Sequence, residues 1–114
     1  MDDVTQYPRS TTEAAITAGA RKPSRIRHRL ERLQEELSRA RATEEVLTDQ
    51  VRYLDEVAED ARIQGLVSET PLADRNARDA RIDRDRHAAL LEETRRKIAG
   101  LLAERDDLLD RLLE

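Results

Sequence analysis

The chain has 114 residues and a net charge of −4, with 40% charged, 38% hydrophobic and only 2% aromatic side chains. Without Phe, Trp or Cys, we expect no thick globular core, no disulfide framework and no thiolate metal site. Its negative charge argues against bulk attraction to nucleic acid, and its abundance of Leu, Ala, Glu, Arg and Asp is typical of long helices.

The N-terminus does not resemble a targeting segment. Residues 1–4 are acidic, and no apolar stretch follows them as in a signal peptide. No run approaches the roughly 18 apolar residues that cross a bilayer. We therefore expect a cytoplasmic protein. Lys occurs only at Lys22 and Lys97 beside many Arg, which hints at a bacterial origin with a GC-rich genome.

Residues 1–22 are polar, small and without a periodic pattern, so we predict a flexible tail. An alternative is a short helix in this segment, because Ser10 and Glu13 have the spacing of a capping box in front of Ala14, Ala15 and Ile16.

The first long helix is predicted over residues 24–64. Pro23 stops a helix upstream, and Ser24 is a suitable N-cap. Gly65 is expected to end the helix in the left-handed conformation. Apolar residues alternate by fours and threes, which is a heptad pattern broken only at Glu44. Its positions are Ile26, Leu30, Leu33, Leu37, Ala40, Leu47, Val51, Leu54, Ala58 and Ala61.

A turn over residues 65–70 precedes a second helix over residues 71–113. Thr70 is its predicted N-cap, Pro71 fits the first helical position, and Asp74 suits the first turn because the helix dipole attracts an anion. The same spacing recurs at Ala73, Ala77, Ala80, Arg84, His87, Leu91, Thr94, Ile98, Leu101, Arg105, Leu108 and Leu112.

The two patterns match each other in opposite directions. If Ala61 faces Ala77, all other layers follow up to Ile26 facing Leu112. Since a lone helix is marginal in water, we predict an all-α fold over residues 23–114: a long antiparallel two-helix coiled-coil hairpin, with dimerisation into a four-helix bundle as an option.

Three finer features follow from this register. The Thr94 hydroxyl would donate to the Glu44 carboxylate. Small alanine layers near the turn would let the helices approach closely. The basic first turns of the first helix would pair with the acidic last turns of the second. The basic residues are Arg25, Arg27, His28, Arg29 and Arg32, and the acidic ones Asp106, Asp107, Asp110 and Glu114.

No pattern for catalysis or metal binding is present. The only histidines, His28 and His87, lie far apart in the hairpin, and no nucleophile–base pair, phosphate loop or zinc motif occurs. We expect no enzyme activity, no cofactor and no metal. The basic run over residues 21–29 could hold phosphates, but pairing with the acidic end is favoured because no aromatic residue in the run could stack a base.

Apolar residues beyond the heptad positions predict three partner-binding surfaces. The first is the hairpin tip, where the structural alternative is that Leu66 and Leu72 only cover the ends of the apolar patterns. The second is a stripe along the first helix, which residues 14–20 could instead cover. The third is the leucine-rich C-terminus. The tip residues are Leu66, Val67, Glu69, Leu72 and Asp74. The stripe consists of Val46, Tyr53 and Val57, with Gln50 between them, and the C-terminal surface consists of Leu102, Leu109 and Leu113.

A hairpin with an acidic tip resembles the N-terminal arm of Gre-type transcript-cleavage factors, which enters the secondary channel of RNA polymerase. The resemblance covers Ala61, Arg62, Gly65 and Glu69, and this sequence has no counterpart of that family's globular domain.

The first helix also resembles helical-hairpin anti-sigma factors that bind cyclic di-GMP through a repeated Glu-x3-Ser-x2-Arg-x3-Gln-x3-Asp motif. Gln34, Ser38, Arg41, Glu45 and Asp49 have that spacing. Glu and Gln are exchanged at two positions and the second helix has no copy, so we assign the chain to neither family.

The sequence therefore predicts a non-enzymatic coiled-coil module or adaptor that binds a protein partner and itself. The alternative is a bacterial transcription regulator that binds RNA polymerase or a sigma factor, with control by a small ligand seated on Ser38 and Arg41 left open.

Overall fold

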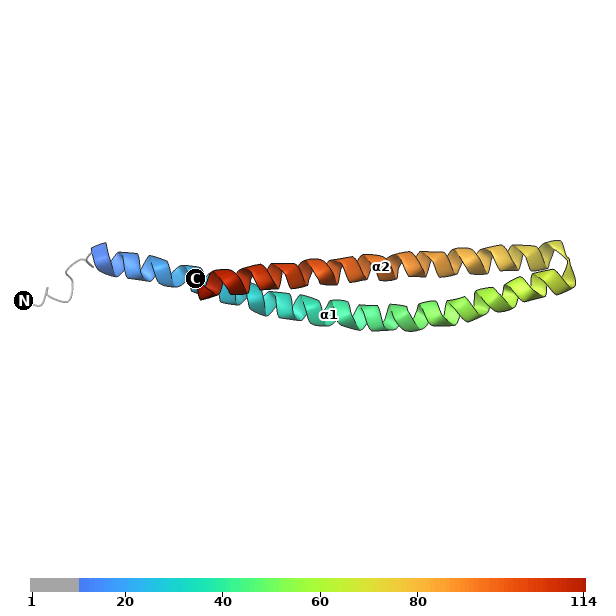
Figure 1. The fold of residues 1–114 in the computed structure, drawn as a ribbon, viewed down its shortest axis with the longest axis horizontal. Coiled ribbons are helices and arrows are strands. Elements are labelled where there is room, and N and C mark those ends of the chain that lie inside the picture. Colours follow the sequence, from blue (N-terminus) through green and yellow to red (C-terminus); the bar gives the residue numbers. More distant parts are fainter. Residues whose placement is uncertain (1–10) are drawn as a thin grey trace, which may run out of the picture.

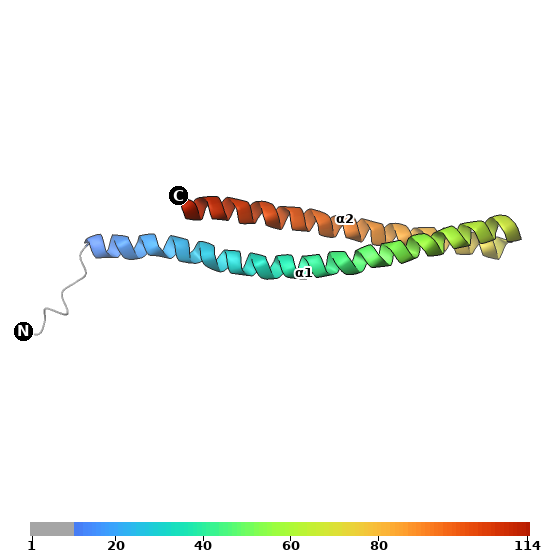
Figure 2. The same cartoon turned by 60° about the horizontal axis from the view of Figure 1, so that its bottom comes forward.

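The structure is a computed structural model that describes the backbone of residues 11–114 and the side chains from Lys22 onward. It contains two long helices, α1 (Thr11–Ser68) and α2 (Pro71–Leu113), and residues 11–114 include no strand. The chain reverses between them and α2 returns along α1 (Figure 1, Figure 2), giving a body 98 Å long and 26 × 16 Å across. The prediction of an all-α protein with two long helices is confirmed.

Helix α1 begins earlier than predicted. It starts at Thr11 and passes through Pro23, which lies inside it. A proline within a helix costs about 3 kcal/mol because it removes one amide donor and crowds the preceding turn. The stretch before Pro23 is rich in alanine, the best helix former. The short-helix alternative was therefore closer to the structure, and the tail prediction for residues 1–10 lies outside the described part.

The turn between the helices is shorter than predicted, and a different residue makes it. Glu69 has a φ of 51°, the left-handed region, and its N–H donates to the Gly65 carbonyl at 3.2 Å. This is the αL ending of a helix. Thr70 then caps α2 as predicted, because its hydroxyl accepts a hydrogen bond from the Ala73 N–H at 3.1 Å, with Pro71 in the first helical turn.

The prediction that Gly65 ends the first helix in a left-handed conformation is wrong. Gly65 lies within α1, and no described glycine has a positive φ. The helix continues for another turn, where Gln64 donates to the Ser68 hydroxyl at 2.9 Å. A Cβ at Gly65 would lie 3.5 Å from Asp74 Oδ1 and 3.7 Å from the Ala73 carbonyl. The glycine therefore sits where α1 passes close to the first turn of α2.

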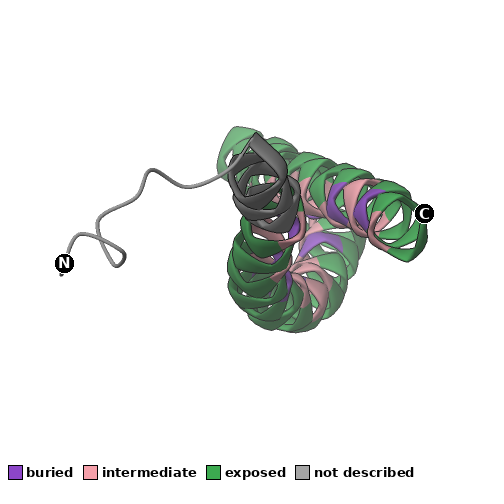
Figure 3. Ribbon diagram, turned by 90° about the vertical axis from the view of Figure 1, so that its left-hand side faces the viewer, coloured by how far each residue is buried: buried purple, intermediate pink, exposed green. Residues whose placement is uncertain are grey.

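The predicted apolar positions are the ones that lie between the helices. We call this set of positions the seam. Every seam residue is buried or half-buried, including the polar ones at Glu44, Arg84 and His87. The view along the long axis shows buried and half-buried residues where the helices face each other and exposed residues outside (Figure 3). Two leucines, Leu33 and Leu37, are almost completely enclosed.

The thickest part of the core lies away from the tip. Leu33 and Leu37 of α1 pack in one cluster with Leu101 and Leu108 of α2. Residues that are far apart in the sequence thus meet, and nothing but a folded-back chain brings them together. Further members of the cluster, buried or packed against it, are Ile26, Leu30, Ala40, Ile98, Leu102 and Leu112.

One polar layer is built differently from the prediction. The Thr94 hydroxyl donates to its own helix, to the Leu90 carbonyl at 3.0 Å, instead of to Glu44. The Glu44 carboxylate lies 3.4 Å from the guanidinium of Arg95. A threonine in a helix readily bonds back to the preceding turn, and a long arginine side chain reaches across the seam more easily.

The left-handed backbone at Glu69 makes a direct stability prediction. Replacing Glu69 with Gly should raise the free energy of unfolding by about 1 kcal/mol, because glycine adopts this conformation without a steric penalty. Urea unfolding followed by circular dichroism measures the change. Ser68→Gly, one residue earlier and inside the helix, should lower stability instead. A destabilised Glu69→Gly variant would contradict the turn geometry.

The enclosed leucines predict where truncating a side chain destabilises the hairpin most. Leu37→Ala should lower the free energy of unfolding by about 2–5 kcal/mol, since it leaves a cavity in the thickest part of the core. Leu90→Ala is the matched control at a side chain that is 49% exposed, and its effect should stay within about 0.5 kcal/mol. Equal effects in urea unfolding would show that the seam does not hold the helices together.

Candidate protein-interaction surfaces

The tip of the hairpin carries a group of exposed apolar side chains. Leu66 and Val67 lie in the last turn of α1 and Leu72 lies in the first turn of α2, and they are 66%, 74% and 64% exposed. Ile63, one turn before Leu66, is also exposed. The predicted acidic residues Glu69 and Asp74 lie on the same tip and face solvent. The structure thus brings all five predicted tip residues to one end of the molecule (Figure 1).

Most of the surface of Leu66 and Leu72 faces solvent and does not cover the ends of the seam. The seam is instead ended by Ala61, which is half-buried, and by the buried Ala73. Alanine is small enough to fit where the helices converge on a two-residue connection. Leu66 and Leu72 are therefore left on the outside of the turn.

A groove of about 300 Å³ opens beside the tip. Both helices contribute to its walls, with Ala61 and Ser68 from α1 and Leu72 and Ala73 from α2. The exposed Leu72 lies on its rim, so an apolar side chain of another protein could pack there.

The predicted stripe along α1 is mostly exposed. Val46 and Tyr53 are 54% and 65% exposed, Gln50 faces solvent, and Val57 is half-buried. The suggestion that residues 14–20 fold over this stripe is wrong. These residues form the first turns of the same continuous helix, so they lie far from the stripe along its axis (Figure 1).

The C-terminal leucines divide into two groups. Leu101 and Leu108 are buried in the seam, while Leu102 is half-buried against the same cluster. Leu109 and Leu113 are exposed, Leu113 by 84%. Two further apolar residues of α2, Ile82 and Leu90, are exposed and are not among the predicted sites. Their positions outside the heptad pattern could have indicated them.

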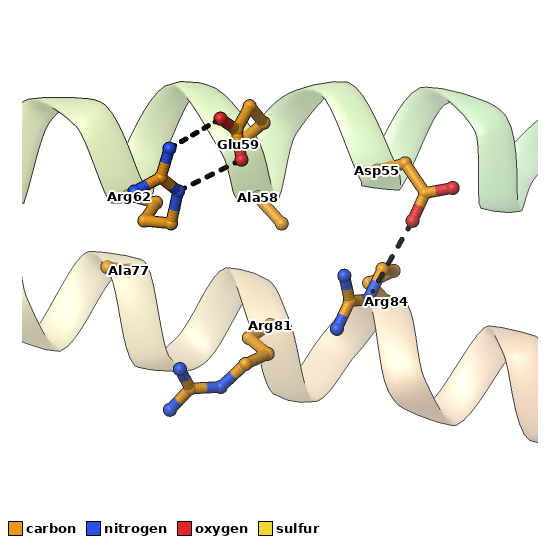
Figure 4. Close-up of a pocket in the computed structure, with 7 residues that line it drawn as sticks. All are labelled: Asp55, Ala58, Glu59, Arg62, Ala77, Arg81 and Arg84. Carbon is orange, nitrogen blue, oxygen red and sulfur yellow. Dashed lines mark hydrogen bonds and ion pairs between the residues drawn. The ribbon is translucent and has the colours of Figure 1, made fainter.

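Small seam residues line a second groove between the helices, in the region where the alanine layers predict close approach. It has a volume of about 290 Å³ and lies over Ala58 and Ala77 (Figure 4). Charged side chains surround this apolar floor, namely Asp55, Glu59, Arg62, Arg81 and Arg84.

Most of these charges neutralise one another. Arg62 donates two hydrogen bonds to Glu59, at 3.0 and 2.7 Å, and Arg84 lies 3.7 Å from Asp55 and 2.8 Å from Asp85. The pair with Arg62 lowers the pKa of Glu59 and raises that of Arg62. The groove therefore has structural ion pairs around its rim instead of a group prepared for chemistry.

One arginine joins the two helices at the other end. Arg29 of α1 donates two hydrogen bonds to Glu104 of α2, and its guanidinium also lies 3.6 Å from Glu36. The hydrogen bonds from Arg29 lower the pKa of Glu104, although partial desolvation opposes them. The hydrogen bonds to Glu104 raise the pKa of Arg29, and the nearby carboxylate of Glu36 adds a smaller effect in the same direction. Arg29 thereby offsets the repulsion between two carboxylates on facing helices.

Charges at the open end, where α1 lies beside the C-terminus, pair less than predicted. Among the side chains from Lys22 onward, the ion pair of Arg29 with Glu104 is the only one that joins α1 to α2 at this end. Arg29 belongs to the predicted basic cluster, but Glu104 does not belong to the predicted acidic cluster. Asp106 and Asp107 lie 3.9 Å from arginines of their own helix, Arg105 and Arg111. The expected pairing of the basic and acidic clusters is therefore not formed.

The histidines do not meet. His28 lies 3.8 Å from Glu31 at the open end, and His87 contacts the Asp83 carbonyl at 2.9 Å in the middle of α2. Within the described residues, no three His, Cys, Asp or Glu side chains are placed to hold a metal ion. Neither α1 nor α2, as far as described, is long and apolar enough to cross a membrane.

Comparisons with known proteins give no relative. No family model, no curated protein and no solved structure matches this chain.

The lowered pKa of Glu104 predicts how stability depends on pH. A carboxyl group with a lowered folded-state pKa stabilises the protein above its unfolded value of 4.5, and this contribution is lost as the pH falls through the folded-state value. Glu104→Gln should therefore lower the melting temperature at pH 7, and the difference from the wild type should shrink at a pH well below 4.5.

Calorimetry at the two pH values measures this difference. Glu93→Gln is the control, because Glu93 is exposed and makes no ion pair within the described residues. A Glu104→Gln variant as stable as the wild type at pH 7 would show that Arg29 and Glu104 do not stabilise the fold.

Proposed function

We propose that this chain is a non-enzymatic, antiparallel coiled-coil hairpin that acts by binding other proteins and itself. The antiparallel arrangement is supported by the two-residue connection between α1 and α2, which is too short for any other neighbouring placement. The coiled coil is supported by the spacing of the buried and half-buried seam residues, which alternates by fours and threes as in a heptad seam.

The observation that carries the function is the exposed apolar tip. Single exposed apolar side chains are common on protein surfaces, but Leu66, Val67 and Leu72 are exposed together at the end of a 98 Å body. Contiguous apolar surface of this kind is typical of protein-binding sites. The groove of about 300 Å³ beside Leu72 gives a partner side chain somewhere to pack.

The second surface is the stripe of Val46, Gln50, Tyr53 and Val57. A tyrosine that is 65% exposed between two valines combines apolar area with a hydrogen-bonding hydroxyl, which is typical of interface residues. We assign this stripe to the same partner or to a second one. We assign no catalytic activity to the protein, because four of the five charged residues around its second groove form ion pairs with one another.

Site-specific crosslinking tests the tip as the docking surface. A photo-crosslinking amino acid at Val67 should give a covalent adduct with a defined host protein, identified by mass spectrometry. The same group at Ile82, which is also apolar and exposed but lies along α2, should not give this adduct. Identical adducts at both positions, or none at Val67, would contradict docking through the tip.

A more specific candidate is a transcription regulator that inserts its tip into RNA polymerase or binds a sigma factor. The observation that favours it is that the carboxylates of Glu69 and Asp74 are exposed beside the apolar tip residues. It predicts that the chain copurifies with polymerase or a sigma factor, and that Glu69→Ala with Asp74→Ala abolishes this contact. A contact that survives both changes would exclude the acidic tip as its cause.

A further inference from the structure

Helix α1 is longer than the helix that covers it. It has 58 residues against 43 in α2, and the core contacts of Ile26 place its first turns beyond the end of α2 (Figure 1, Figure 2). We call residues 11–24 the overhang. A helical segment of this length extends about 20 Å. Because α2 does not extend beside the overhang, and helices in proteins gain most of their stability from packing, another surface that covered the overhang would stabilise it.

The open end offers such a surface on α2. Leu109 and Leu113 are exposed, and Leu102 is half-buried two turns before Leu109. These three residues recur at intervals of seven and four, so they form one apolar strip on α2 beside the seam. A strip from Leu102 to Leu113 is about 17 Å long, close to the length of the overhang.

The charged residues at the open end also favour contact between the overhang and α2 of another copy. Lys22 lies in the last turn of the overhang and Arg25 directly follows it, and both face solvent. Asp110 in the last turn of α2 and Glu114 directly after α2 are exposed as well. Within the side chains described, no ion pair joins these basic residues to these acidic ones. Among the described side chains, the complementary charges at the open end are therefore not paired with each other.

We propose that two copies associate open end to open end about a twofold axis, so that the overhang of each copy lies on the strip of Leu102, Leu109 and Leu113 of the other. This inference rests on the self-association in the proposed function and names its surface. If the two α2 helices end at the same level, the overhang runs parallel to α2 of the second copy. Lys22 then lies near Asp110 of that copy, and Arg25 lies near its Glu114.

The symmetry makes every contact occur twice, as in any isologous interface. It also leaves both tips free at opposite ends of a long particle. The second copy is favoured over an unrelated protein because this single arrangement uses the unpaired length, the apolar strip and both charge clusters at once.

Paired charge reversals on the full chain test the arrangement. Lys22→Glu with Arg25→Glu makes both patches of one copy acidic, and Asp110→Arg with Glu114→Arg makes both patches basic. Sedimentation equilibrium should find a wild-type dimer and a dissociation constant raised about ten- to a hundredfold for each variant alone, because each replaces attraction by repulsion. An equimolar mixture of the two variants should restore dimers, since every contact between unlike copies is complementary again.

Circular dichroism checks that both variants remain helical, and Asp60→Arg with Asp79→Arg is the control for a charge change away from the open end. A wild-type dimer that resists both reversals would overturn the open-end arrangement and leave self-association through another surface, such as the stripe of Tyr53. A monomeric wild type would overturn both the arrangement and the proposed self-association. Crosslinking at the tip is read separately, so neither result depends on the partner.

Discussion

Burial of the apolar seam between α1 and α2 is the interaction on which the rest of the structure depends. The chain has no aromatic core and its helices make contact only along one face, so each buried leucine counts. Leu33 and Leu37 are enclosed at the thick end, where α2 supplies Leu101 and Leu108. Towards the tip the seam thins to alanines, and a groove opens over Ala58 and Ala77. Stability is thus concentrated far from the turn.

This uneven seam explains where the molecule can interact. At the tip, alanines suffice to close the helices, and the larger side chains are left outside. At the open end, α1 continues past α2, and both the leucine strip of α2 and the charged residues near the two helix ends are exposed. The two ends therefore suit different tasks: the tip faces outward from a rigid body, while the open end has the composition of a self-complementary contact. The middle carries the stripe around Tyr53 and, on α2, the exposed Ile82 and Leu90.

The heptad spacing made the helices and the buried positions predictable from the sequence, because one face of each helix must be apolar for the other to cover it. The role of Thr70 as N-cap was equally predictable, since a Thr-Pro pair before an apolar pattern is typical of a helix start. The same reasoning placed the partner-binding residues outside the seam, and the structure finds most of them exposed.

The features that could not be predicted from the sequence are those for which neighbouring residues compete for the same role. Gly65 signalled a helix end, but continued helix and a strained Glu69 satisfied the turn instead. Thr94 and Arg95 both could have reached Glu44, and the longer side chain did so. Pro23 signalled a helix start, yet α1 passes through it. The pairing of Arg29 with Glu104 depended on side-chain reach across the seam, which spacing alone does not determine.

A distance measurement between the two ends of the folded chain tests the hairpin most directly. The chain has no cysteine, so Arg27→Cys and Asp110→Cys provide two unique sites for spin labels on exposed residues of the open end. Double electron–electron resonance on labelled chains diluted with unlabelled protein should give a single short distance, on the order of 20–30 Å, as expected for two helices packed 8–10 Å apart with flexible labels. The absence of this distance, as for one straight helix that separates the labels by about 125 Å, would contradict the seam as the organising contact.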